Sequence, residues 1–521
     1  MELRSRRDFL ADVGKGMLTA SVGTALTSEL GLSTALAEGG ANTQEFGRLE
    51  PLVALLQENT AERMLPLVVE RLAQGTELRD VVAAAALANA RTFGGEDYIG
   101  FHAFMAMAPA YEMTKEMPSD RKMLPVLKVL YRSTNQIQAK GGRSNEVLHP
   151  VEAIPMPAST EKRVVLREAM RRQEMDRAEG LFAGLVARSP AEAYNDLQAL
   201  VQDDADVHRV VLAYRAWDLL GLTGKEYAHA TLRQSVRYCV SVEKSRIAHG
   251  HPEPGIRTVL PKVLEQYRRT LRTDRLSGSR EADDAWIRSL CNTLLSSSPA
   301  QAADAIGAVL AEGFSVNAVG EALSLAATQQ VLRDPGRTQA YPGKPVGSVH
   351  GDSYGVHASD SMNAWRNIAK VSQPYNAITG LIVAGYHLVS SAGRDWKNLM
   401  PYPFSEHKLA LKTQDPAGLL RELEGAIREN QQANAAAIVQ HYGALGHSVR
   451  PVFELLLRYA ISEDGALHAE KYYRTVVEEF GRTRKAHRWD HVVALARVTA
   501  SEYGKRAEGY EQACSLLHVK G

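Results

Sequence analysis

Two tyrosine–histidine pairs, each in a glycine-containing segment, are the strongest candidates for chemistry in this chain. Tyr98 precedes His102 by four residues, and Tyr354 precedes His357 by three. Imidazole binds metal ions and haem iron, and it exchanges protons near neutral pH. The glycines in both segments permit a tight turn before a helix. We therefore expect these four side chains to be catalytic, with the histidines binding a cofactor or shuttling protons.

A second pair of histidines opens two similar apolar runs. His208 begins His-Arg-Val-Val-Leu-Ala, and His491 begins His-Val-Val-Ala-Leu-Ala. We expect this pair to contribute to cofactor binding. The cofactor itself is not identified by any motif, and a non-covalent metal ion or haem is compatible with the histidines. Cys-x-x-Cys, Cys-x-x-Cys-His, the phosphate loop, Gly-x-Gly-x-x-Gly and the Gly-x-Ser-x-Gly elbow do not occur, which argues against iron–sulfur clusters and covalent haem.

Other histidine spacings carry less weight. His487 precedes His491 by four residues, which places two imidazoles on one helix face. Glu146-x-x-His149 and Glu226-x-x-His229 have the form found in di-iron helical bundles. With 16 histidines in the chain, such spacings also arise by chance. Surface or hydrogen-bonded core histidines are the alternative interpretation of each.

A long loop precedes the second tyrosine–histidine pair. Residues 334–349 contain three prolines and three glycines, which mark a connection rather than a helix. The polar residues 349–361 that follow are expected to line a pocket, with residues 394–407 as another wall. The alternative is a solvated loop in which an Asp or Ser caps the next helix.

The elements that must position these residues are expected to be helices. Apolar residues recur at steps of three, four and seven, as in Leu65, Val68, Val69 and Leu72. No convincing alternation with a period of two is present. Further helical runs are expected over residues 81–90, 207–220, 300–310, 377–389, 451–461, 470–480 and 490–503. The predicted fold class is an all-α, multi-helical array.

The array is expected to consist of two related halves, residues 45–255 and 285–521. Residues 55–90 align without gaps on residues 293–328, and eight of the 36 pairs are identical. A chain this rich in Ala and Leu yields about three such identities by accident. The two tyrosine–histidine segments extend the match, so a duplication would bring His102 and His357 to equivalent places around a shared pocket.

The N-terminus resembles a twin-arginine export signal. Residues 5–10 read Ser-Arg-Arg-Asp-Phe-Leu, and a weakly apolar stretch leads to Ala35-Leu36-Ala37, a small-x-small cleavage site. We expect residues 1–37 to be a signal peptide read by the twin-arginine machinery. The protein would then be periplasmic or extracellular, folded before transport, with no transmembrane segment after signal removal. A plain amphipathic helix is the alternative.

Composition excludes several classes of protein. The 521 residues include 61 Lys and Arg against 60 Asp and Glu, so overall charge does not favour nucleic-acid binding. The three cysteines are odd in number and far apart, unlike a disulfide framework or a zinc finger.

Helices bearing histidines in this order resemble the questin oxidase-like family of all-helical proteins. The stretches that carry the resemblance cover under a fifth of the chain: 100–112, 207–214, 356–358 and 375–387. The resemblance implies oxygen-dependent oxidation of an aromatic or polyketide-like ring without an obvious bound cofactor, and it assigns no catalytic residue. The export signal is not part of that family's pattern.

Two functions therefore stand as hypotheses. The first is an oxidoreductase that binds a small molecule in a pocket at the junction of the halves. The second is a non-catalytic helical binding or scaffold protein with a concave face. An enzyme would gather its ionisable groups in one pocket, whereas a scaffold would spread its histidines over the surface.

Overall fold

The structure is a computed structural model. It describes residues 43–521 apart from residues 158–160, 275, 277, 279, 341–343, 352, 391–397 and 410. The expected signal peptide at residues 1–37 lies outside the described residues.

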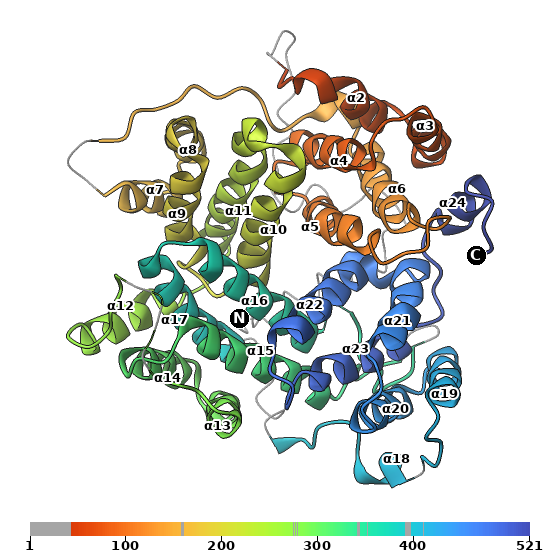
Figure 1. Cartoon of the computed structure of the whole chain (residues 1–521). Coiled ribbons are helices and arrows are strands. Elements are labelled where there is room, and N and C mark those ends of the chain that lie inside the picture. Colours follow the sequence, from red (N-terminus) through yellow and green to blue (C-terminus); the bar gives the residue numbers. More distant parts are fainter. Residues whose placement is uncertain are drawn as a thin grey trace. The chain divides into compact units, whose positions relative to one another are not determined.

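All regular secondary structure among the described residues is helical (Figure 1), which confirms the predicted all-α class. Two isolated bridges, Arg280 with Phe314 and Glu463 with Arg506, are its only extended pairings, and no strand forms among the described residues. The same residues contain no helix that combines the length and apolar character needed to cross a membrane.

The first helices run up to the polar segment near residue 280. They are α2 (Glu50–Glu58), α3 (Ala61–Ala73), α4 (Leu78–Phe93), α5 (Tyr98–Met113), α6 (Leu124–Ala139), α7 (Lys162–Arg171), α8 (Met175–Arg188), α9 (Pro190–Val201), α10 (Val207–Thr223), α11 (Ala228–Ala248) and α12 (Ile256–Gln266).

The remaining helices follow it. They are α13 (Asp284–Ser296), α14 (Pro299–Ala311), α15 (Val316–Arg333), α16 (Tyr354–Val371), α17 (Pro374–Ser390), α18 (Ser405–Leu409), α19 (Pro416–Arg428), α20 (Gln432–Ala444), α21 (Arg450–Ser462), α22 (His468–Arg482), α23 (Trp489–Glu502) and α24 (Tyr510–Leu516). Short 3-10 turns occupy Gly47–Leu49, Gly142–Asn145, Lys225–Tyr227 and Gly465–Leu467.

Four of these helices form a closed ring of neighbours. Helix α10 packs against α5 and α16, and α22 packs against the same two helices (Figure 1). Helices α4 and α6 lie beside α5, α15 and α17 beside α16, α11 beside α10, and α23 beside α22. The ring is therefore screened from solvent by a second layer of helices.

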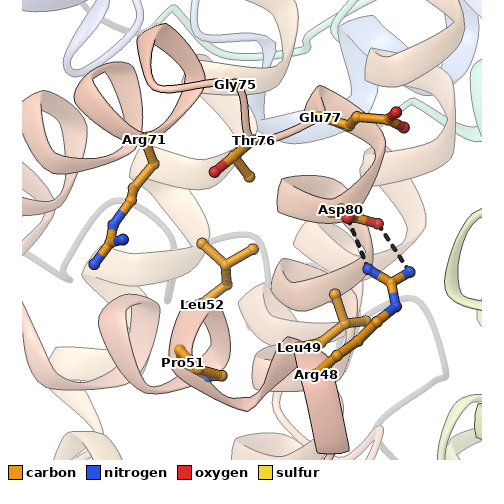
Figure 2. A pocket seen from close by; sticks show the side chains of 9 residues that line it. All are labelled: Arg48, Leu49, Pro51, Leu52, Arg71, Gly75, Thr76, Glu77 and Asp80. Carbon is orange, nitrogen blue, oxygen red and sulfur yellow. Dashed lines mark hydrogen bonds and ion pairs between the residues drawn. The ribbon is translucent and has the colours of Figure 1, made fainter.

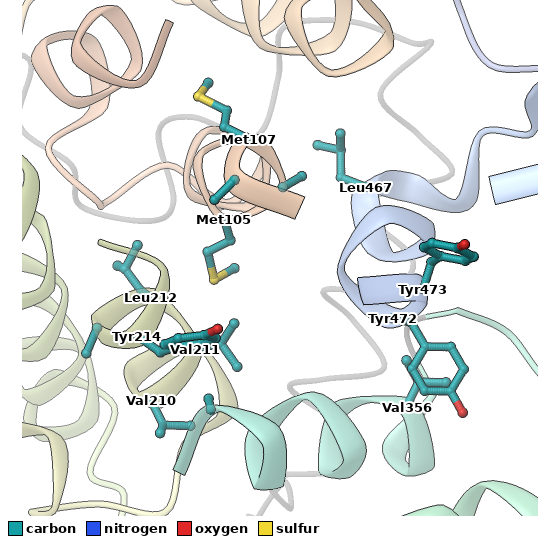
Figure 3. Close-up of a cluster of buried hydrophobic side chains, with 14 of the residues drawn as sticks. Met105, Met107, Val210, Val211, Leu212, Tyr214, Val356, Leu467, Tyr472 and Tyr473 are labelled. Atoms are coloured by element: carbon teal, nitrogen blue, oxygen red, sulfur yellow. The ribbon is translucent and has the colours of Figure 1, made fainter. Parts of the chain in front are cut away.

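Apolar side chains pack between the four helices in the interior of the ring. Met105 of α5, Leu212 of α10 and Val356 of α16 are buried there, together with Leu467 directly before α22 (Figure 3). Burial of such side chains contributes about 1.5–3 kcal/mol each, which keeps the four helices in contact.

Side-chain N-caps begin three of the ring helices. Asp97 accepts a hydrogen bond from the backbone N–H of Gly100 at 2.7 Å, and Asp206 accepts one from His208 at 2.9 Å. The Ser353 hydroxyl caps α16 in the same way. Asp and Ser are strong N-caps because their oxygens satisfy amides that have no partner within the helix.

The described residues of the loop, 334–340 and 344–349, form no helix, as the sequence predicts, and backbone hydrogen bonds join its two parts. The Arg337 N–H donates to the Ser348 carbonyl at 2.9 Å, and Gly347 donates to the Arg337 carbonyl at 2.8 Å. Val349 is fully buried. These contacts hold the described residues of the loop in place directly before α16.

Candidate functional site

Four histidines, one from each helix of the ring, meet in the interior. His102 lies on α5, His208 on α10, His357 on α16 and His468 on α22. The Nε2 atoms of His357 and His468 are 3.1 Å apart. The ring centroid of His102 lies 4.9 Å from that of His208 and 4.9 Å from that of His468. The ring centroids of His208 and His357 are 5.7 Å apart. We call these four residues the histidine cluster.

Three members of the cluster have the spacing of metal ligands. His102, His208 and His357 each offer one ring nitrogen, and these three atoms all lie within 4.8 Å of one another. A metal ion about 2.0–2.1 Å from each nitrogen would fit between them after small side-chain adjustments. His468 reaches the same centre through its contact with His357.

Hydrogen bonds to backbone carbonyls set the orientation of two of the rings. His102 Nδ1 lies 2.7 Å from the Tyr98 carbonyl oxygen, and His468 Nδ1 lies 3.0 Å from that of Ala466. A carbonyl oxygen only accepts, so each Nδ1 carries the proton and donates it, which leaves Nε2 unprotonated: that of His102 has no partner, and that of His468 faces His357 Nε2 at 3.1 Å. Metal-binding histidines commonly use such a second bond to fix the tautomer and the ring direction.

Ring nitrogens without a hydrogen-bond partner point to a ligand. The Nε2 atoms of His102 and His208 are buried and form no hydrogen bond. A buried polar atom without a partner is costly, by about 1–3 kcal/mol. Binding a cation would satisfy both nitrogens at once.

The electrostatic surroundings keep the cluster neutral. Burial lowers the pKa of His208 to about 4, and the Lys471 ammonium adds to this effect although Asp206 opposes it. Burial and Lys471 also hold the pKa values of His102 and His468 well below the usual range of histidine. Neutral imidazole is the form that binds metals, so the cluster is ready to bind at physiological pH.

A buried lysine and two buried carboxylates complete the polar interior. Burial lowers the pKa of Lys471 to about 8, while Asp360 and Glu470 oppose that shift. Asp360 accepts a hydrogen bond from the Thr475 hydroxyl at 2.8 Å, and burial raises its pKa to about 6. Glu470 forms an ion pair with Lys128 at 2.7 Å.

Aromatic rings and a small cavity border the cluster. Tyr98 packs on His102 with ring centroids 4.3 Å apart, and Phe101 lies 5.1 Å from His208. Burial raises the pKa of Tyr98 to about 12, so its phenol stays protonated. On the other side, His468 helps to line a cavity of about 40 Å³ between α21, α22 and α23, with Tyr472 and Leu495 in its wall.

The cluster unites most of the residues singled out in the sequence. His102, His357, His208 and Tyr98 lie together. Tyr354 is the first residue of α16 and is 37% exposed, whereas Tyr98 is half-buried.

His491 lies in a different environment. Its Nδ1 is 2.7 Å from the Thr328 hydroxyl, and its Nε2 is 3.1 Å from the Thr483 hydroxyl. Both ring nitrogens are therefore engaged in hydrogen bonds within the core.

Sequence reasoning missed His468. Its helix follows a turn with no Gly-x-x-Tyr segment, so the pattern that marks His102 and His357 is lacking. One shared feature was present: His102, His357 and His468 are each followed by alanine, a small residue that suits the close packing of ring helices.

Residues from two of the other histidine spacings make local contacts away from the cluster. Glu146 forms an ion pair with Arg91 at 3.0 Å, in a segment without regular structure. His487 Nδ1 lies 2.9 Å from an Arg288 nitrogen, and its Nε2 lies 3.2 Å from the Asp284 carbonyl. Neither spacing joins the histidine cluster.

A larger cavity lies elsewhere on the molecule (Figure 2). It measures about 350 Å³ and is lined by residues of α2, α3 and α4, including the Arg48–Asp80 ion pair and Arg71. None of the residues singled out for chemistry lines it. We therefore base the function on the histidine cluster, where the buried polar atoms are.

Comparison with known proteins yields no family. No protein-family model, curated protein or solved structure matches this chain.

Proposed function

We propose that the protein is a metal-dependent oxidoreductase whose single transition-metal ion is bound by His102, His208 and His357, with His468 as a fourth ligand. The observation that carries the proposal is the set of three ring nitrogens, one from each of these histidines, within 4.8 Å, together with the buried Nε2 atoms of His102 and His208 that form no hydrogen bond. Imidazole ligands suit iron, copper and zinc, and the first two of these metals support electron transfer or oxygen chemistry.

The surroundings of the cluster favour oxidation over hydrolysis. Tyr98 and Phe101 pack on the histidines, and His102 and His468 are fully buried. A dry apolar shell tunes a metal's redox potential and limits solvent access. The resemblance to questin oxidase-like chains agrees with an aromatic ring as the substrate. The gathering of four histidines in one place, two of them fully buried, also favours an enzyme over a scaffold.

Two related halves would explain how the cluster arises. Helix α3 (Ala61–Ala73) and helix α14 (Pro299–Ala311) begin and end at the same offset of 238 residues as the sequence match. The packing is also reciprocal, because α12 contacts α14 and α17 while α24 contacts α3 and α6. In this proposal each half contributes two histidines to one shared centre.

Export by the twin-arginine pathway remains part of the proposal. It is supported by the Ser-Arg-Arg-Asp-Phe-Leu sequence at residues 5–10. That pathway carries folded proteins, which suits a chain whose cofactor is enclosed before transport.

Metal content tests the function directly. Elemental analysis and an ultraviolet–visible spectrum of the purified protein should show one iron or copper ion per chain. His102→Ala and His357→Ala should each weaken metal binding by at least about tenfold, because each removes a ligand. His491→Ala is the matched control, since it removes a buried histidine outside the cluster.

The outcomes separate the two hypotheses. Loss of metal in the cluster variants, but not in His491→Ala, supports the metal centre. A metal-free wild-type protein, or equal metal content in all variants, would contradict it and leave the binding scaffold as the better hypothesis.

A further inference from the structure

We propose that Lys128 is a positioning residue: it clamps the turn before α22 and thereby holds His468 against the other three histidines. The consequence for metal binding rests on the proposed function, whereas the placement of the ring does not. Lys128 lies on α6, outside the four-helix ring, and touches none of the four imidazoles by the contacts described above.

The turn that carries His468 has an unfavourable backbone conformation. Gly465, Ala466 and Leu467 have φ angles of 51°, 47° and 65°, all in the left-handed region. Only glycine enters this region readily, and other residues each pay about 1–2 kcal/mol. Two successive non-glycine residues there persist only when the surroundings impose the conformation.

This conformation directs the histidine. The Ala466 carbonyl accepts the proton of His468 Nδ1 at 3.0 Å, which turns Nε2 toward His357 at 3.1 Å. Leu467, with 3% exposure, anchors the turn in the core. If Ala466 relaxed to an ordinary conformation, its carbonyl would move and the ring would lose this bond.

Lys128 supplies the constraint from both sides of the turn. Its buried ammonium donates to the carbonyls of Ala460 at 2.8 Å and Glu463 at 2.6 Å, before the turn. It also forms an ion pair with Glu470 at 2.7 Å, after the turn. Lys128 is 5% exposed and Glu470 is fully buried, so solvent does not screen these contacts.

A cavity lies next to the imidazole of His468. His468, Glu463 and Gly465 all line the cavity of about 40 Å³ beside the cluster. Loss of the clamp would let the His468 imidazole turn toward this cavity and away from His357. The contacts of Lys128 therefore determine whether the His468 imidazole points toward the other three histidines or toward the cavity.

Cobalt binding tests the inference, because Co²⁺ reports its ligands through its visible absorption bands. Lys128→Met/Glu470→Gln removes both charges of the ion pair, which avoids leaving one buried charge alone. We expect this double variant to bind Co²⁺ about 10–100-fold more weakly, with bands like those of His468→Ala. The single variant Lys128→Arg keeps the positive charge and the hydrogen-bond donors at this position. It should retain much of the wild-type cobalt spectrum.

Arg233→Met/Glu179→Gln is the matched control. Arg233 and Glu179 form another buried ion pair, at 2.9 Å, between α11 and α8. This control should lose comparable stability and keep the wild-type cobalt spectrum. Wild-type affinity and bands in the Lys128 double variant would overturn the inference, as would an equal loss in the control.

A readout without metal separates this inference from the proposed function. In metal-free protein labelled with ¹⁵N-histidine, His468 should appear as the Nδ1–H tautomer, and Lys128→Met/Glu470→Gln should remove that signature. If the wild type binds no Co²⁺, the metal centre fails while this spectrum still tests the clamp. An unchanged His468 signal in the double variant would refute the clamp.

Discussion

Each histidine of the cluster lies within the first five residues of its helix, where the helix dipole is positive. This position disfavours the imidazolium form, as do burial and the Lys471 ammonium. Three independent features of the structure thus act in the same direction. The cluster consequently resembles a metal site prepared before the metal arrives rather than a group of histidines that titrate near neutrality.

At the residue scale, Asp360 should make stability depend on pH. Burial raises its pKa to about 6 in the folded protein, against an ordinary value of 3.8. The folded state therefore favours the protonated acid, and this contribution is complete below about pH 4 and lost as the pH rises through 6. Asp360→Asn mimics the neutral acid and still accepts from Thr475.

The measurement is denaturant unfolding of metal-free protein at pH 4 and pH 7. From pH 4 to pH 7, wild-type stability should fall by about 2–3 kcal/mol more than that of Asp360→Asn. Lys471, Thr475 and Arg215 face this carboxyl in both proteins, so their contribution is shared. The same pH dependence in both proteins would show that Asp360 is not held neutral.

At the element scale, the helices that position the cluster begin in two ways. Helices α5, α10 and α16 start at Asp or Ser caps. Helix α22 has no side-chain cap and starts after the left-handed turn at Gly465–Leu467. Its start therefore depends on contacts with distant parts of the chain, above all Lys128.

Substitutions at Ala466 should reveal this dependence. Ala466→Val places a β-branched side chain at a φ of 47° and should destabilise the protein by about 1–2 kcal/mol. Ala466→Gly relieves that strain but loses chain entropy on folding, so its stability should stay within about 0.5 kcal/mol of wild type. Urea unfolding provides the measurement, and a Val variant as stable as wild type would argue against the left-handed turn.

The two kinds of helix start also explain what the sequence could predict. Asp97 and Ser353, with the glycines around them, mark helix starts that are visible in the sequence, and the histidines a few residues later were found. Ala466 and Leu467 carry no such mark, because their conformation comes from tertiary contacts. His468 and its clamp could therefore be found only in three dimensions.

At the scale of the whole molecule, the two proposed halves interlock. Helix α12 packs on α14 and α17, and α24 packs on α3 and α6, so each would bury apolar surface supplied by the other half. The four histidines come equally from the two sides of the connection near residue 280. The helical class was accessible from periodicity, and the sequence singled out both His102 and His357, which the structure brings close together. The placement of His491 outside the cluster was not, because its similarity to His208 is limited to a short apolar run.

Interlocking predicts how a divided protein behaves. Residues 43–272 and 281–521, expressed separately, should fail to fold, since each exposes the surface that the other covers. Co-expressed, the two pieces should associate and bind metal as the intact chain does. Size-exclusion chromatography with metal analysis is the measurement. A single piece that folds and binds metal alone would contradict the proposal that both pieces supply ligands to the centre.

The enclosure of the histidine cluster also has a kinetic consequence. His102 and His468 expose 1% and 0% of their surface and His208 and His357 are only partly exposed, so an ion at the centre would leave chiefly when ring helices separate. Release would then follow the rate of that local opening rather than the strength of the metal–nitrogen bonds. A chain that folds in one compartment and works in another would keep the metal of the first, whatever ions surround it later.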